Sequence, residues 1–241
     1  MTAPAIIGRD KELAGLKLRL AKRHSFLLHG PVGVGKTTLV RALLNDHPEI
    51  LYCPDSSGKQ RVIRSIALAL SGRHRGAARV LGGSAAINAR SAVSLKGIVQ
   101  DLLRAGKYWV VLDHLHLPSQ AFAADIKELA GWAMTPVLGI ARSDHMEDIG
   151  FLRSLFIDRS EKLELRNFDE PQAEAFARHV IEASQLSATN ANEFLARVLE
   201  LSAGNPGVIV AMVEMAKLPK YRSGAQIMVS PLYIDFRMGA L

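Results

Sequence analysis

The residues of this sequence best suited to chemistry form one short glycine-rich segment. Residues 30–37 read Gly-Pro-Val-Gly-Val-Gly-Lys-Thr and fit G-x-x-x-x-G-K-[ST] at every fixed position. Glycine lets the backbone turn so that successive N–H groups face a phosphate, and a following helix adds its positive end. In such a loop Lys36 reaches the β- and γ-phosphates of a nucleotide, and the Thr37 hydroxyl binds Mg²⁺. We therefore expect ATP to contact Gly30, Pro31, Val32, Gly33, Val34, Gly35, Lys36, Thr37 and Thr38.

The residues on either side of the loop fit this interpretation. Ser25–His29 is a short apolar run typical of a strand, and apolar residues recur at helical spacing from Leu39 to Leu44. A strand before the glycines and an amphipathic helix after them are the context that such a loop needs. The flanks thus favour a phosphate-binding loop over a chance glycine-rich turn.

A second metal-binding group follows another apolar run. Val110, Val111 and Leu112 lead directly into Asp113. P-loop ATPases hold Mg²⁺ through a carboxylate at the end of a neighbouring strand. The sequence therefore predicts a metal site with Thr37 on one side and Asp113 on the other.

The next residue departs from the usual arrangement. The sequence has His114 where such ATPases usually carry a glutamate that polarises the attacking water. Three interpretations stay open: the imidazole orients water, it senses the γ-phosphate or a partner without acting as a base, or it is structural. Nucleotide binding is therefore better supported than fast hydrolysis.

The apolar runs alternate with helical patterns along the first two thirds of the chain. They predict strands over residues 25–29, 50–53, 108–112, 137–141 and 162–165, and helices over 59–70, 95–104, 119–133 and 146–155. Strands that are apolar throughout and separated by helices indicate a parallel sheet covered on both faces. The predicted fold class is α/β, with the three-layer α/β/α core of a P-loop NTPase.

After residue 165 the pattern changes to three successive helices, over residues 171–184, 190–201 and 206–217. We expect residues 1–166 to form the ATPase core and residues 167–241 to form a small α-helical lid with a C-terminal tail. Residues 72–90 are rich in Gly, Ala and Arg with weak periodicity. That segment is expected to be a mobile loop or an irregular insertion.

With these residues the chain resembles the AAA+ and STAND branches of the P-loop ATPases, and is similar to origin-recognition, transposition-helper and STAND signalling ATPases. Besides the loop and Asp113, three segments carry the resemblance. Residues 6–13 look like the h-h-G-R-x-x-E-L segment, residues 140–143 stand where the family has its first sensor, and Gly204–Gly207 is similar to the G-N-P turn of the lid.

The resemblance implies an adenine site and a lid. The backbone of Ile7, Gly8 and Arg9 would lie against the adenine, and the turn containing Pro206 would close over the nucleotide. Unlike in the family, we expect no winged-helix domain of normal length after the lid. The resemblance therefore implies a bare ATPase module or the nucleotide-binding member of a multi-protein system.

The resemblance also assigns roles to three arginines. Arg142 would sense the γ-phosphate, as in STAND proteins, and the alternative is a surface arginine beside Asp144. Arg153 and Arg159 stand where the family offers an arginine finger to the adjacent subunit, and the alternative for each is a structural salt bridge. The expected catalytic set is Lys36, Asp113, His114 and Arg142.

The positive charge of the chain is concentrated in one window. The formal net charge is +7, yet residues 59–107 alone carry ten basic side chains and one acid, Asp101. Basic residues gathered in this way predict salt-sensitive contact with the backbone of DNA. The window contains no aromatic side chain for stacking on bases. The alternatives are a solvated surface or a docking patch for an acidic partner.

Composition narrows the class of protein. The longest segments without charge contain Gly and Pro and fall short of the about 20 apolar residues that a spanning helix needs, so we expect no membrane span and a cytoplasmic protein. The sequence best fits a slow ATPase whose nucleotide state controls self-assembly, in a ring or filament, and engagement of DNA or a partner protein. The alternatives are a non-hydrolysing switch in a signalling or defence complex and a small-molecule kinase.

Overall fold

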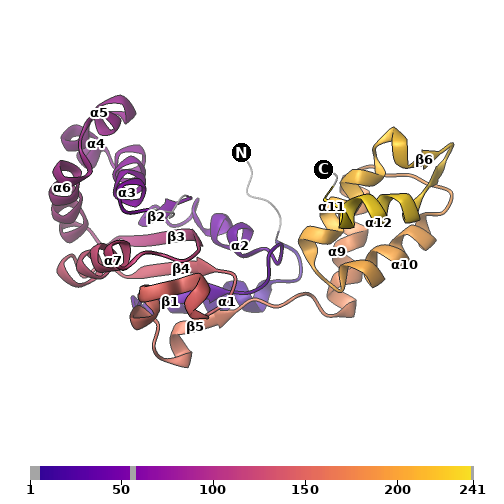
Figure 1. Ribbon diagram of the computed structural model, residues 1–241, viewed down its shortest axis with the longest axis horizontal. Helices are drawn as coiled ribbons and strands as arrows, with labels where there is room; N and C mark the ends of the chain where they lie inside the picture. The colour runs from indigo at the N-terminus through magenta and orange to yellow at the C-terminus, as the bar shows by residue number, and fades with distance from the viewer. Residues whose placement is uncertain (1–5, 55–57, 240–241) are drawn as a thin grey trace. The chain divides into compact units, whose positions relative to one another are not determined.

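The chain folds into two compact units (Figure 1). The computed structural model describes residues 6–54 and 58–239. Of these, the α/β unit contains Lys11–Gly30 and Lys36–Leu165, and the helical unit contains Ile6–Asp10, Pro31–Gly35 and the chain from Arg166 onward. The phosphate-loop segment is therefore divided between the two units.

The α/β unit is built on a five-stranded sheet of order β2-β3-β4-β1-β5. All its strand pairs are parallel, as the apolar runs predict. The strands are β1 (Phe26–His29), β2 (Ile50–Cys53), β3 (Trp109–Leu115), β4 (Val137–Ala141) and β5 (Lys162–Glu164). Because the strands are parallel, the segments that follow β1, β3 and β4 leave the sheet at the same edge.

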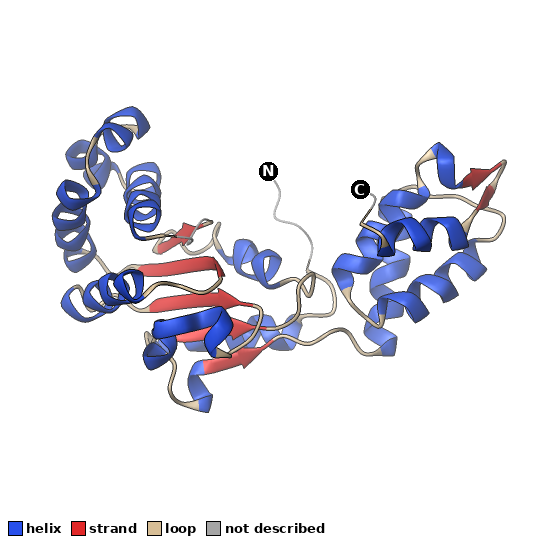
Figure 2. Cartoon of the chain, in the orientation of Figure 1, coloured by secondary structure: helices blue, strands red, loops and turns tan. Residues whose placement is uncertain are grey.

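Helices cover both faces of this sheet (Figure 2). Leu27 of β1 belongs to a core shared with the helices between β2 and β4, whereas its neighbours Phe26 and Leu28 are buried on the opposite face. The α/β/α prediction is thereby confirmed. The helices are α1 (Asp10–Lys22), α2 (Lys36–Leu43), α3 (Lys59–Arg73), α4 (Arg75–Leu81), α5 (Ser84–Ala89), α6 (Ala92–Ala105), α7 (Gln120–Trp132) and α8 (Met146–Ile149), with 3-10 turns at Gly150–Leu155 and Arg159–Glu161.

The expectation of an irregular segment over residues 72–90 is wrong. The segment contains α4 and α5, and its apolar residues Ala77, Leu81 and Ile87 are buried in the core with α3 and α6. Two glycines that weaken the periodicity lie between the helices, and Gly82 ends α4 with a left-handed φ of 79°. We name residues 59–105, which contain α3–α6, the helical insertion.

The helical unit follows β5. Its elements are α9 (Glu170–Ala183), α10 (Ala191–Ser202), α11 (Pro206–Ala216), a 3-10 turn at Pro219–Tyr221, a small hairpin of β6 (Arg222–Ser223) and β7 (Gln226–Ile227), and α12 (Val229–Arg237). The three predicted helices are present, and the tail joins their core through Tyr221, Ile227 and Leu232. In the described part of the chain, no helix is long and apolar enough to cross a membrane.

Replacement of Ile87 by Ala tests whether α5 is part of the folded core. Ile87 is 0% exposed, so Ile87→Ala should lower the free energy of unfolding by about 2–4 kcal/mol. Ile157 is 74% exposed in the same unit, and Ile157→Ala should change it by less than about 0.5 kcal/mol. Urea unfolding of the full chain measures both, and equal stability of the two variants would contradict the helical insertion described here.

Candidate phosphate and metal site

The loop of residues 30–37 connects β1 to α2 and contains three glycines with positive φ. The φ values are 150° at Gly30, 81° at Gly33 and 97° at Gly35. A Cβ at Gly30 would lie 2.0 Å from the Leu165 carbonyl oxygen, so no side chain fits there. A Cβ at Gly35 would meet no atom within 4 Å, which leaves open space beside the loop at this position.

Lys36 is the first residue of α2, and its amine turns back over the loop. The Nζ atom donates to the Gly30 carbonyl oxygen at 2.6 Å. Burial lowers the pKa of Lys36 from its ordinary value, Asp113 opposes this effect, and the positive charge of Arg142 adds to it. The positive charges of Lys36 and Arg142 repel each other. The phosphates of a nucleotide would place negative charge beside both and relieve this repulsion. The loop therefore fits the phosphates of a nucleotide.

Asp113 lies within β3, which continues to Leu115 rather than ending before the carboxylate. The pairing of β3 with β4 shifts between Leu112 and Leu115, so Asp113 and His114 occupy a β-bulge. The Asp113 side chain is 1% exposed. Its Oδ2 atom accepts a hydrogen bond of 2.9 Å from the Thr37 hydroxyl. The two residues expected to hold the metal are thus in direct contact.

The oxygen chemistry of this pair suits Mg²⁺, which prefers hard oxygen ligands and keeps several waters or phosphate oxygens around it. Thr37 and Asp113 supply a hydroxyl and a carboxylate. No group of three His, Cys, Asp or Glu side chains among the described residues could hold a metal ion by itself. A metal at this pair would therefore complete its shell with phosphate and water.

Tyr52 is a further residue of this site, and the sequence pattern did not identify it. Its hydroxyl donates to Asp113 Oδ2 at 2.5 Å. Burial and the neighbouring Asp113 carboxylate raise the pKa of Tyr52 to about 12, because both disfavour the phenolate. The available signal is that Tyr52 is the one residue with a polar tip in the otherwise apolar β2.

His114 points outward from the bulge. Its side chain is 72% exposed, and its Nε2 atom lies 3.8 Å from Asp113 Oδ2. The backbone has a left-handed φ of 56°, which is unusual for a residue other than glycine. The backbone N–H of His114 donates to Asp113 Oδ1 at 2.8 Å. Position 114 thus supports the carboxylate through its backbone and leaves the imidazole in solvent.

Arg142 follows β4, which lies between β1 and β3 in the sheet. Its backbone carbonyl accepts a hydrogen bond of 3.2 Å from the N–H of Gly30. Asp144, which the alternative interpretation pairs with this arginine, instead accepts a hydrogen bond from Lys162 Nζ at 2.8 Å. The exposed Arg142 guanidinium has no carboxylate partner within residues 6–54 and 58–239.

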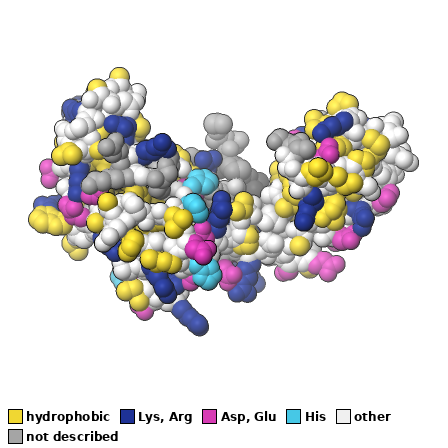
Figure 3. Space-filling model, in the orientation of Figure 1, with side chains coloured by type: hydrophobic (Ala, Val, Ile, Leu, Met, Phe, Trp, Pro, Cys, Tyr) yellow, Lys and Arg dark blue, Asp and Glu magenta, His cyan; other side chains and the backbone are white. Residues whose placement is uncertain are grey.

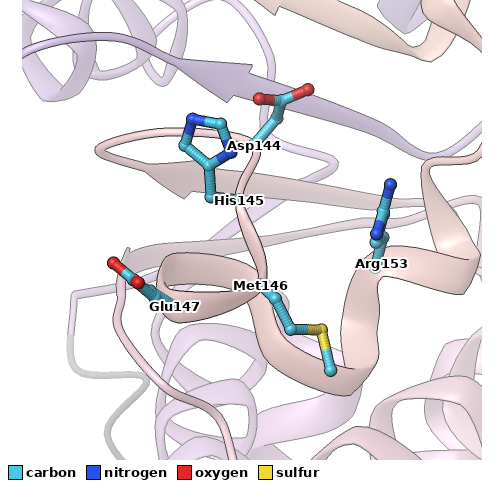
Figure 4. A pocket seen from close by; sticks show the side chains of 5 residues that line it. All are labelled: Asp144, His145, Met146, Glu147 and Arg153. Carbon is cyan, nitrogen blue, oxygen red and sulfur yellow. The ribbon is translucent and has the colours of Figure 1, made fainter.

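An open pocket of about 730 Å³ lies after β4, around the start of α8 (Figure 4). Its lining residues are Asp144, His145, Met146, Glu147 and Arg153. The Arg153 side chain lies across the pocket from Glu147. Arg159 lies in the next 3-10 turn. Both arginines are exposed, and in the described part of the chain neither forms the salt bridge that is their alternative interpretation.

Residues 6–10 are bound within the helical unit. The Arg9 side chain is 6% exposed, lies 4.1 Å from the centre of the Phe168 ring and donates to the Arg166 carbonyl at 2.7 Å. Gln172 donates to the carbonyl oxygen of Gly8 at 3.3 Å. Arg9 therefore fixes the segment by its side chain, and Gly8 contributes its backbone carbonyl. The expected contact of Ile7, Gly8 and Arg9 with adenine stays a prediction.

The turn before α11 contacts the loop residues that belong to the helical unit. Asn205 Nδ2 donates to the Val32 carbonyl at 2.9 Å, and the Gly207 N–H donates to the Gly33 carbonyl at 2.9 Å. Pro206 is buried at the first turn of α11. Asn205 is a second residue of the site that the sequence pattern does not identify, although it lies in the turn that resembles the G-N-P turn of the lid.

Several basic side chains of the helical insertion serve the fold. Arg64, Arg73 and Arg90 donate to the backbone carbonyls of Arg90, Leu44 and Val80, and Lys96 pairs with Asp125 and Glu128. Arg75 and Arg79 of α4 are exposed, as is Lys107, which follows the insertion. The Lys59 side chain lies outside the described part of the structure. On the face shown in Figure 3, basic side chains over the insertion are scattered among apolar ones.

Comparisons with known proteins agree with this geometry. Residues 20–139 match the family model of the AAA domain. No curated protein matches the chain. Among solved structures, the chain is similar to a Walker-type ATPase of Pyrococcus abyssi, with a TM-score of 0.66 at 16% identity over 98% of this chain and 73% of that one.

Two further structures belong to Orc1 and Cdc6 proteins. The Orc1 protein of Aeropyrum pernix, solved in complex with DNA, gives a TM-score of 0.63 at 18% identity over 98% of this chain and 66% of that one. Cdc6p of Pyrobaculum aerophilum gives 0.62 at 13% identity over 98% of this chain and 64% of that one. The present chain thus spans about two thirds of these two proteins. Residues 20–139 thus match an AAA domain, and the solved structures show that the chain has the fold of a P-loop ATPase.

Proposed function

We propose that this chain binds Mg·ATP at Gly30–Thr38 and hydrolyses it slowly, and that its nucleotide state controls self-assembly and engagement of DNA or a partner protein. The observation that carries the proposal is the 2.9 Å hydrogen bond between the Thr37 hydroxyl and Asp113. It joins the start of the loop helix to the buried carboxylate of β3. AAA ATPases in general use a nucleotide and Mg²⁺.

Each residue of the proposed site has a separate task. The loop N–H groups and Lys36 bind the phosphates, and Thr37 and Asp113 hold Mg²⁺. Bound there, Mg²⁺ would neutralise charge that develops on the phosphate oxygens. Arg142 would bind the γ-phosphate from the end of β4, and His114 would orient the attacking water from the bulge. The exposed imidazole is a weaker acceptor for this task than a carboxylate, so turnover is slow.

The proposed control of assembly uses exposed arginines and the helical unit. Arg153 and Arg159 are exposed, which suits a group offered to a neighbouring subunit. Residues 167–241 act as a lid, and Asn205 links that lid to the loop through the Val32 carbonyl. A change of the loop on nucleotide binding would thereby reach α11.

The proposed DNA contact lies on the helical insertion. Arg75 and Arg79 are exposed on α4, whereas the guanidinium of Arg73 on α3, also exposed, donates to the carbonyl of Leu44. The structure of the similar Orc1 protein in complex with DNA supports this choice of partner at the level of fold.

Lys36→Ala tests the nucleotide site. The change removes the amine that would bind the β- and γ-phosphates, so affinity for ATP should fall by at least about tenfold while the fold is retained. Lys17→Ala, which removes an exposed lysine of α1, should leave the affinity unchanged. Calorimetric titration with ATP measures both variants, and wild-type affinity in Lys36→Ala would refute the site.

Substitutions at His114 test the hydrolysis mechanism. His114→Ala should leave ATP binding unchanged. Residue 114 donates to Asp113 through its backbone N–H, which the substitution keeps, and the His114 side chain is 72% exposed. His114→Glu should raise turnover about tenfold, which corresponds to about 1.4 kcal/mol of barrier. Phosphate release by dilute protein, without any added acceptor, measures the rate.

Other outcomes of that assay identify other functions. Fast hydrolysis by the dilute wild-type chain would contradict the role of His114. Tight ATP binding with no turnover in either the wild type or His114→Glu would favour a non-hydrolysing switch. Turnover that requires a small-molecule acceptor would favour a kinase.

Charge reversal on α4 tests the DNA contact. Arg75→Glu with Arg79→Glu should weaken binding of duplex DNA to a similar extent for all sequences and flatten its dependence on salt, because fewer counterions are released. Arg178→Glu with Arg197→Glu changes the net charge equally on two exposed sites of the helical unit, and it should leave the salt slope unchanged. Fluorescence anisotropy with two unrelated duplexes at several salt concentrations measures both slopes. An unchanged slope in the α4 variant would move the contact elsewhere or remove it.

A further inference from the structure

Tyr52 lies at the metal site on a strand that the phosphate-loop pattern does not include. It belongs to β2, an edge strand that is otherwise made of buried apolar residues. The half-buried Tyr52 donates its hydroxyl to Asp113 Oδ2 at 2.5 Å. This contact joins β2 to the carboxylate that is proposed to hold Mg²⁺.

The hydrogen bonds of Asp113 account for most of its acceptor positions. A carboxylate has about four lone-pair positions, two on each oxygen. Oδ2 accepts from both Thr37 and Tyr52, and Oδ1 accepts from the backbone N–H of His114. One position, on Oδ1, is left for the ion or a water bound to it. Tyr52 and Thr37 together therefore fix the direction in which that position faces.

Tyr52 is itself held by the helix that follows the loop. The Arg41 guanidinium carbon lies 5.3 Å from the centre of the Tyr52 ring, and Arg41 Nη2 donates to the Tyr52 hydroxyl oxygen at 3.4 Å. Arg41 follows Thr37 by four residues on α2, so the two side chains share one face of that helix. Helix α2 thus reaches Asp113 directly through Thr37 and indirectly through Arg41 and Tyr52.

We propose that Tyr52 is a positioning residue for the metal: its hydroxyl holds the Asp113 carboxylate in the orientation that binds Mg²⁺ beside the nucleotide. The inference rests on the proposed nucleotide site and adds a metal-specific role to it. Groups that orient a metal ligand typically contribute 10–100-fold to metal affinity. Loss of the hydroxyl therefore weakens binding of Mg·ATP and leaves binding of metal-free ATP unchanged.

The test is Tyr52→Phe, which keeps the ring beside Arg41 and removes only the hydroxyl. The affinity for ATP is measured by calorimetry in excess Mg²⁺ and again in EDTA, and the ratio of the two affinities gives the contribution of the metal. The variant should lower this ratio about tenfold, with unchanged affinity in EDTA. A general loss of structure would instead lower both affinities together, and the thermal midpoint without ligands monitors folding.

Tyr221→Phe is the matched control, because Tyr221 donates its hydroxyl to Asp235 Oδ2 at 2.7 Å in the helical unit. It should leave the affinity ratio at the wild-type value. An unchanged ratio in Tyr52→Phe, or an equal loss in EDTA and in Mg²⁺, would overturn the role of Tyr52 while the nucleotide site stands. If the wild-type chain binds neither form of ATP, the proposed function fails, and this inference fails with it.

Discussion

The arrangement of the site depends on the parallel pairing of β1, β4 and β3. Because neighbouring parallel strands end at one edge of a sheet, the loop after β1, Arg142 after β4 and Asp113 in β3 lie at the same edge. The hydrogen bond from Thr37 to Asp113 then joins the helix after β1 to β3, past the end of β4. A register shift of one residue in β3 would turn Asp113 to the opposite face, so the pairing of β3 with β4 also fixes the site.

Much of this architecture could be predicted from the sequence because the signals are local. Continuous apolar runs identify buried parallel strands, and the loop pattern identifies its own chemistry. The bulge in β3 and the contact of Tyr52 with Asp113 could not be predicted in the same way, since both depend on how separate strands pair. The prediction of an irregular segment over residues 72–90 is wrong for a related reason. The few apolar residues of this segment are buried only because it packs against α3 and α6, which the local pattern does not indicate.

The basic window shows the limit of charge counting. A sum over residues 59–107 treats every arginine alike, yet Arg64 and Arg73 donate to backbone carbonyls, and Lys96 pairs with two carboxylates. Such contacts satisfy polar groups at helix ends and between helices, and their side chains are less available to a polyanion. The side chains that stay available to a polyanion form a smaller set, which includes Arg75 and Arg79. Which side chains these are depends on how the helices of the insertion pack.

The loop is also constrained from the helical unit, and here the choice of residue is chemically narrow. Ser, Thr, Asp and Asn can each accept hydrogen bonds at the start of a helix, as Asn205 Oδ1 does from Gly207 and Val208. Only asparagine among them also supplies an amide donor pair, which Asn205 directs to the Val32 carbonyl and to Asn167. An aspartate would keep the helix cap but place a negative oxygen against the Val32 carbonyl. The Asn205 side chain thus caps α11 and also binds the loop, and of these four residues only asparagine makes both sets of hydrogen bonds.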